Sequence, residues 1–107
     1  MIELREKHCI YDEKLTLLNR RELEGLKAEL SSGWKIIENK KLFKQFSFEN
    51  YQLVMAFAQD VAAIAEQENH HPDMCIHYQS VDVEFITHSH GGLTENDFIM
   101  AAKIEEL

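Results

Sequence analysis

Apolar residues recur at helical spacing near the start of the chain, and this pattern predicts a first helix. The stripe consists of Leu23, Leu26 and Leu30. Asn19 precedes the stripe, and Glu22 lies three residues after Asn19, which is the pattern of a capping box. We therefore expect this helix to begin after Asn19, and Gly33 is a suitable residue for its stop.

A longer helical stripe occupies the middle of the chain and predicts a second helix. Its members are Leu53, Val54, Phe57, Val61, Ile64 and Ala65. Ser47 is a suitable cap for the start of this helix, and the pattern runs to about Asn69. Pro72, the only proline, prevents the helix from continuing.

Four shorter segments have the character of strands, at residues 34–38, 42–46, 74–79 and 81–86. Gly91-Gly92 predicts a turn after the fourth, and Thr94 can cap a last helix. Short connections favour antiparallel pairing, and helices must cover one face of the resulting sheet. The prediction is an α+β fold, a four-stranded antiparallel sheet with three helices packed on one face. We expect a single domain over residues 1–107, in which residues 1–15 either add an extended segment or stay loosely ordered.

Composition narrows the class of protein. Hydrophobic residues make up 45% of the chain, and 11 basic against 19 acidic residues give a formal charge of -8. This charge argues against nucleic acid and against anionic membrane surfaces as partners. No apolar run reaches the roughly 20 residues that span a bilayer, and the charged start lacks a signal core. Cys9 and Cys75 form no C-x-x-C motif and read as free thiols. We expect a cytoplasmic protein.

Five of the six histidines fall between positions 70 and 90, which points to chemistry in the second half of the chain. The first cluster is Glu66-x-x-x-His70-His71-Pro72. Glu66 and His70 are four apart, so we expect them to share a helix face, with the histidine pair at the helix end. The alternative is a pair of surface or capping histidines.

Two further residues complete the candidate set. His88 follows the fourth predicted strand, where functional groups are common, although a polar loop with an incidental histidine is the alternative. Asp97 lies three residues after Thr94, where an acidic side chain stabilises a helix whatever its function.

Imidazoles and carboxylates also raise the question of a metal site. His88 and His90, with His70, His71, His77 and Glu66, offer suitable ligand atoms. However, no familiar zinc spacing such as H-E-x-x-H occurs, and adjacent histidines diverge on a helix. We expect no metal.

Taken in order, these residues resemble the motif of the pterin-4a-carbinolamine dehydratase family, also called the dimerisation-cofactor family. That motif has an acidic or polar residue, three residues, His-His-Pro, an aromatic after five more, a histidine after nine more and an aspartate after eight or more. The matching residues are Glu66, His70, His71, Pro72, Tyr78, His88 and Asp97. Gly33-Trp34 and the run at 43–48 resemble the family's first half, so the likeness covers about residues 16–107.

The resemblance implies an enzyme without a cofactor. Its reaction is the dehydration of 4a-hydroxytetrahydrobiopterin, or a related pterin, to the quinonoid dihydropterin, in recycling of the tetrahydropterin. Histidine suits this proton transfer because its ordinary pKa is about 6.5. His70 and His88 are the expected acid–base pair, His71 orients the pterin, and Asp97 orients a histidine. The expected substrate contacts are Trp34, Glu66 and Tyr78.

The resemblance also implies a homodimer or homotetramer, and it leaves two other functions open. One is a non-catalytic scaffold, since a family member in animals is the dimerisation partner of a homeodomain transcription factor. The other is a pocket for a different pterin, for example in molybdenum-cofactor metabolism.

Overall fold

The computed structural model describes residues 2–107, and its elements follow the predicted order. They are η1 (Leu4–Glu6), α1 (Arg20–Lys27), β1 (Lys35–Ile37), β2 (Lys41–Ser47), α2 (Tyr51–Glu68), β3 (Asp73–Ile76), β4 (Ser80–Phe85), η2 (His88–His90) and α3 (Glu95–Ile104). The α-helices and strands alternate as helix, strand, strand, helix, strand, strand, helix. The two 3₁₀ turns, η1 and η2, are additions that the sequence pattern did not predict.

The four strands form one antiparallel sheet in the order β1-β2-β4-β3. β4 lies inside the sheet, where Leu42 of β2 pairs with Phe85 and Asp73 of β3 pairs with Glu84. The α+β prediction of a four-stranded antiparallel sheet with three helices is confirmed. β1 and β3 are the two edge strands.

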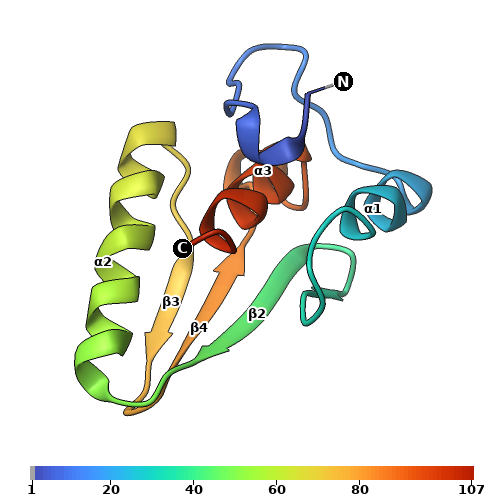
Figure 1. Cartoon of the computed structure of the whole chain (residues 1–107). Coiled ribbons are helices and arrows are strands. Elements are labelled where there is room, and N and C mark those ends of the chain that lie inside the picture. Colours follow the sequence, from blue (N-terminus) through green and yellow to red (C-terminus); the bar gives the residue numbers. More distant parts are fainter. Residues whose placement is uncertain (1) are drawn as a thin grey trace.

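The core lies between the sheet and the helices. Val81, Val83 and Phe85 of β4 are fully buried, whereas the intervening Asp82 and Glu84 are partly exposed. This alternation aims one face of the sheet at the helices. α3 runs between α2 and α1 (Figure 1). Its six side chains from Phe98 to Ile104 other than Lys103 are each at most 8% exposed. Burying one such large apolar side chain stabilises the fold by roughly 1.5–3 kcal/mol.

The first helix begins as predicted and ends earlier. The Asn19 side chain accepts from the backbone N–H of Glu22, and the Glu22 carboxylate accepts from that of Asn19, both at 2.9 Å. The helix stops at Lys27, however, and the chain continues in tight turns to Gly33. Gly33 has a φ of +102°, a conformation that disfavours other residues. Gly33 therefore belongs to the loop before β1 and is not the helix stop.

The second helix corrects two predictions. Its cap is Asn50, whose side chain accepts from the N–H of Leu53 at 2.9 Å, whereas Ser47 is the last residue of β2. Its end is set by Asn69, which takes the left-handed conformation with a φ of +53°. His70 therefore lies beyond the helix, and the idea that it shares a helical face with Glu66 is wrong.

Two strands are shorter than predicted because their ends form turns. Glu38 and Asn39 both have positive φ, as a tight turn between antiparallel strands requires, so β1 stops at Ile37. The N–H of His77 donates to the carbonyl of Ser80 at 2.8 Å, and the chain reverses there. As a result, β3 ends at Ile76, and Tyr78 lies in the turn.

The segment before α1 is held firmly to the domain. Asn96 of α3 accepts from the N–H of Ile10 and donates to its carbonyl, at 3.1 and 2.8 Å. Glu68, at the end of α2, accepts from the N–H of Cys9 at 2.8 Å and bonds to His8 at 2.7 Å. Of the two alternatives for residues 1–15, the described part fits the extended segment; residue 1 lies outside the described residues.

Candidate active site

The candidate site lies where the chain enters β3 and leaves β4. In the β3–β4 register Asp73 pairs with Glu84, so continuing the register by three residues in each direction brings His70 opposite Thr87. The side chains of His70 and Thr87 both bond to the same carboxylate, that of Asp97. Residues from the α2–β3 connection, the end of β4 and the start of α3 thus converge at one point.

Asp97 is the centre of a buried network. Its Oδ1 accepts from Nε2 of His70 at 2.7 Å, and its Oδ2 accepts from the Thr87 hydroxyl at 2.8 Å and from the N–H of Thr94 at 2.9 Å. The Thr94 contact belongs to the capping box of α3. Asp97 and Thr94 are completely buried. The carboxylate that caps α3 is therefore also the one that bonds to His70.

This network determines which ring nitrogen of His70 is available. A carboxylate only accepts hydrogen bonds, so Nε2 carries the hydrogen and donates it in the bond to Asp97. In the neutral ring, Nδ1 then has the lone pair. Among the described residues no partner is found for Nδ1, and no buried side-chain nitrogen or oxygen is left without one. Nδ1 therefore reaches the surface of the molecule, although the whole residue is only 6% exposed. The ring also stacks on Phe85, with centroids 6.2 Å apart.

His71 lies beside Glu66 at the surface. Its Nε2 bonds to the Glu66 carboxylate, and the two side chains are 53% and 77% exposed. Glu66 thus supports His71, and not His70 as the four-residue spacing indicated. The two adjacent imidazoles diverge, one into the buried network and one to solvent.

His88 and His90 lie in the 3₁₀ turn η2, directly after Thr87. His88 is exposed, and among the described residues its side chain has no hydrogen bond or ion pair with another candidate residue. His90 has a different role, because its Nε2 donates to the carbonyl of Leu15 at 2.9 Å and so fixes the segment before α1. Of the two, His88 is the one whose imidazole is free for chemistry.

Trp34 and Tyr78 do not gather with the histidines. Trp34 is 3% exposed and its indole N–H donates to Glu105 at 2.9 Å, at the end of α3. Tyr78 is 72% exposed in the β3–β4 turn, at the opposite end of these strands from His70.

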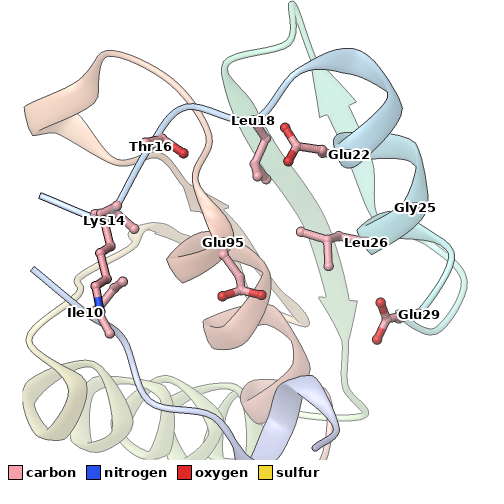
Figure 2. Close-up of a pocket in the computed structure, with 10 residues that line it drawn as sticks. Ile10, Lys14, Thr16, Leu18, Glu22, Gly25, Leu26, Glu29 and Glu95 are labelled. Carbon is pink, nitrogen blue, oxygen red and sulfur yellow. The ribbon is translucent and has the colours of Figure 1, made fainter. Parts of the chain in front are cut away.

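A cavity of about 490 Å³ contains none of the candidate residues. It lies between the N-terminal segment, α1 and α3, and Figure 2 shows Lys14, Glu22 and Glu95 around it. No histidine lines it, so the convergent network around Asp97 marks the candidate site better than cavity size does.

Sequence reasoning missed three residues around His70. Thr87 was not singled out, although it directly precedes His88. Tyr11 donates its hydroxyl to the carbonyl of Asn69 at 2.6 Å, and its ring centroid lies 6.5 Å from that of His70. Glu68 holds the same segment in place. The contacts of Tyr11 and Glu68 join residues almost sixty positions apart and leave no local pattern.

The possible metal ligands considered in the sequence analysis do not gather either. Within residues 2–107, the one group of three or more histidine, cysteine or carboxylate side chains with ligand atoms within 4.8 Å of one another is Cys75, His77 and Asp82. It includes His77 from the set considered above, and none of the candidate catalytic residues. Over the same residues, no helix combines the length and apolar character needed to cross a membrane.

Comparisons with known proteins identify the family to which this chain is similar. The family model described as pterin 4 alpha carbinolamine dehydratase matches residues 16–107. Curated relatives named "Putative pterin-4-alpha-carbinolamine dehydratase" include one from Nitrosomonas eutropha, 47% identical over 84% of this chain and 79% of the relative. Another, from Rickettsia canadensis, is 46% identical over 98% of this chain and 97% of the relative.

A solved structure is similar as well. It is described as the crystal structure of a transcriptional coactivator/pterin dehydratase from Brucella melitensis. Its TM-score with this chain is 0.78 at 31% identity, covering 83% of this chain and 95% of that one. The likeness therefore extends to the arrangement of the sheet and helices.

Proposed function

This chain belongs to the pterin-4a-carbinolamine dehydratase family, and we propose that its substrate is 4a-hydroxytetrahydrobiopterin or a closely related pterin. The activity is that of a hydro-lyase. The 4a-hydroxyl leaves as water after receiving a proton, and ring nitrogen N5 loses its proton to form the quinonoid dihydropterin. The reaction is redox-neutral, so two positioned acid–base groups are sufficient for it. It would return the pterin to the tetrahydropterin cycle.

His70 is the proposed base, and the observation that carries the proposal is its bond to Asp97. The carboxylate accepts from Nε2 at 2.7 Å, which leaves the lone pair on the outward Nδ1. The same carboxylate stabilises the positive charge that His70 gains when Nδ1 takes the proton from N5. The Thr87 hydroxyl and the Thr94 N–H hold the carboxylate in place.

His88 is the proposed acid that protonates the leaving hydroxyl. It follows Thr87 directly, so it is attached to the same end of β4 as the Asp97 network. Its exposure allows it to exchange protons with water between turnovers. A positioned acid or base typically contributes about 10²–10⁴-fold to a rate.

The remaining predicted residues would contact the pterin. His71, held by Glu66, follows His70 directly in the chain and is proposed to orient the ring. Trp34 would contact the substrate only after a rearrangement, since its ring lies in the core. Tyr78 would reach a site only in another copy of the chain, because it lies at the far end of β3 and β4. Both remain predictions.

A homodimer or homotetramer in the cytoplasm is also part of the proposal. The edge strands β1 and β3 offer unpaired backbone groups, and proteins commonly cover such edges. Ile76 and Tyr78, on and beside β3, are 38% and 72% exposed. Light scattering at micromolar concentration should give a multiple of the 12.5 kDa chain, and a 12.5 kDa particle would contradict the assembly. Both cysteines are free thiols, as is usual in a reducing compartment.

The proposal is tested by stopped-flow spectroscopy with synthetic 4a-hydroxytetrahydropterin. We expect the folded protein to accelerate dehydration well above the spontaneous rate in buffer. A rate equal to buffer alone would favour the scaffold function. A strong preference for a different pterin in the same assay would favour the other alternative.

A further inference from the structure

Cys75, His77 and Asp82 gather on the sheet face that points away from the helices. Cys75 and Asp82 are direct partners in the β3–β4 register. His77 lies two residues after Cys75, and side chains two apart on an extended segment point the same way. Asp82 alternates with the buried Val81 and Val83, which face the core. Three chemically different donor atoms thus lie within 4.8 Å of one another on a rigid hairpin.

The carboxylate of this group is already oriented. Nε2 of Gln45, on the neighbouring strand β2, donates to Oδ1 of Asp82 at 2.7 Å. The other carboxylate oxygen of Asp82, Oδ2, faces His77, whose Nε2 lies 3.0 Å away. A carboxylate that is oriented by a hydrogen bond from a residue outside the ligand set is well placed to bind a cation.

A hollow of about 230 Å³ adjoins the group and is lined by both Cys75 and Asp82. Two more carboxylates, Asp73 and Glu84, line the same hollow. Their negative charge favours a cation there, and the hollow leaves room for a water molecule as an additional ligand. The three donor residues lie toward the β3–β4 turn, whereas the dehydratase site lies at the other end of the two strands.

We propose that Cys75, His77 and Asp82 form a binding site for a zinc-type divalent metal ion, with water as the fourth ligand. A thiolate, an imidazole and a carboxylate favour zinc over magnesium or calcium, which prefer oxygen ligands alone. Zinc bonds of about 2.0–2.3 Å in a tetrahedron place ligand atoms roughly 3.5 Å apart. Rotation of the exposed Cys75 and His77 side chains closes the present spacing. The ion takes the place of the His77–Asp82 hydrogen bond and ties the turn to β4.

Titration of the full chain with Co²⁺ under a non-thiol reductant tests the proposal. We expect one Co²⁺ per chain, with a thiolate-to-cobalt charge-transfer band in the near ultraviolet and the visible bands of a tetrahedral ion. Zn²⁺ should displace it. Cys75→Ser should abolish the charge-transfer band. The matched control is Cys9→Ser, which should leave the band intact because Cys9 is on the other side of the sheet, against Glu68 and Asn96.

Three other variants separate a three-residue site from a single reactive thiol. His77→Gln and Asp82→Asn should each weaken binding strongly. Gln45→Ala should keep the band but weaken binding by about 10- to 100-fold, as loss of a ligand's supporting partner does. Since these side chains lie outside the core, thermal melts should confirm that each variant folds.

The absence of a band at equimolar Co²⁺ would overturn the proposal. So would a band that depends on Cys9, or one insensitive to both His77→Gln and Asp82→Asn. The dehydratase assay is a separate readout, because none of these residues belongs to the proposed catalytic set.

Discussion

Nε2 of His70 and Oδ1 of Asp97 lie 2.7 Å apart in the interior, although 27 residues separate them in the chain. The bond joins the connection before β3 to the first turn of α3. It makes the orientation of the imidazole depend on the folding of that helix. Catalytic and structural effects of changes at this pair are therefore coupled, and measurements must separate them.

Asp97→Asn should reduce both stability and turnover. The amide lacks the charge that strengthens the bonds to His70, Thr87 and Thr94, and loss of such bonds costs about 1.5–3 kcal/mol. Turnover per folded molecule should fall about 10²-fold, because the amide no longer stabilises a protonated His70. Thermal melts and stopped-flow rates measure the two effects. Glu95→Gln is the control. Glu95 lies two residues before Asp97 in the first turn of α3 but outside the network, so its loss should change turnover little. An Asp97→Asn protein with normal turnover would remove Asp97 from the site.

His88→Ala should leave the fold nearly unchanged, since the imidazole is exposed and has no side-chain hydrogen bond among the described residues. It should lower turnover by about 10²–10⁴-fold. His90→Ala is the matched control in the same turn. It loses the bond to the Leu15 carbonyl and should lower the melting temperature while turnover is retained. Equal rates for His88→Ala and the unmodified protein would contradict the role of His88 as the acid.

Trp34→Phe should separate a core role from contact with the pterin. The change removes the indole N–H that Glu105 accepts, which costs about 1–2 kcal/mol. From its buried position we expect a lower melting temperature with an unchanged KM. A raised KM with an unchanged melting temperature would instead support the predicted substrate contact.

Glu68 should make the stability of the chain sensitive to acid. Burial alone raises the pKa of this carboxyl, but the bonds from the Cys9 N–H and His8 and the charge of Lys103 outweigh it, so the pKa falls below the ordinary 4.5. A group whose pKa is lowered by folding stabilises the fold above its ordinary pKa. That contribution is lost as the pH falls through the lowered value.

We therefore expect Glu68→Gln to be less stable than the unmodified chain at neutral pH, with the gap narrowing below about pH 4.5. Melting temperatures of both proteins across the acid range provide the measurement. A gap that stays constant with pH would show that the charge of Glu68 is not responsible. Glu66→Gln, exposed and close in sequence, is the control and should show little difference.

Chelation with EDTA should leave the dehydratase rate unchanged. The proposed proton transfers use His70 and His88, whereas the inferred zinc-type site lies at the far turn of the β3–β4 hairpin. Cys75 is five residues from His70, roughly 17 Å along an extended chain. Loss of activity with EDTA, restored by zinc, would show instead that a metal takes part in dehydration.

The sequence predicted what depends on local patterns. The Asn19–Glu22 capping box was found because its partners are three residues apart, and the strand predicted at residues 81–86 is close to the observed β4 (Ser80–Phe85). The cap of α2 was misplaced because both Ser47 and Asn50 are suitable capping residues, and only pairing with Ser80 assigns Ser47 to β2.

The motif identified the candidate site residues, and their geometry could be predicted only in part. The family-like motif brought together His70, His88 and Asp97, but the helix was expected to include His70. A left-handed Asn69 ends the helix sooner, so the neighbour that Glu66 meets is His71. Nothing local indicated Thr87 as a partner of Asp97, since that contact depends on how β4 and α3 pack.

The docked N-terminal segment has a practical consequence for protein engineering. The family model starts at residue 16, which invites truncation there. Such a truncation would strip Glu68 and Asn96 of the backbone groups of Cys9 and Ile10, and it would remove Tyr11 from the peptide just before His70. The boundary of the unit that folds and the boundary of the recognisable homology are therefore different. A protein expressed from residue 16 onward would be less stable than the full chain, and an assay of it would underestimate the activity.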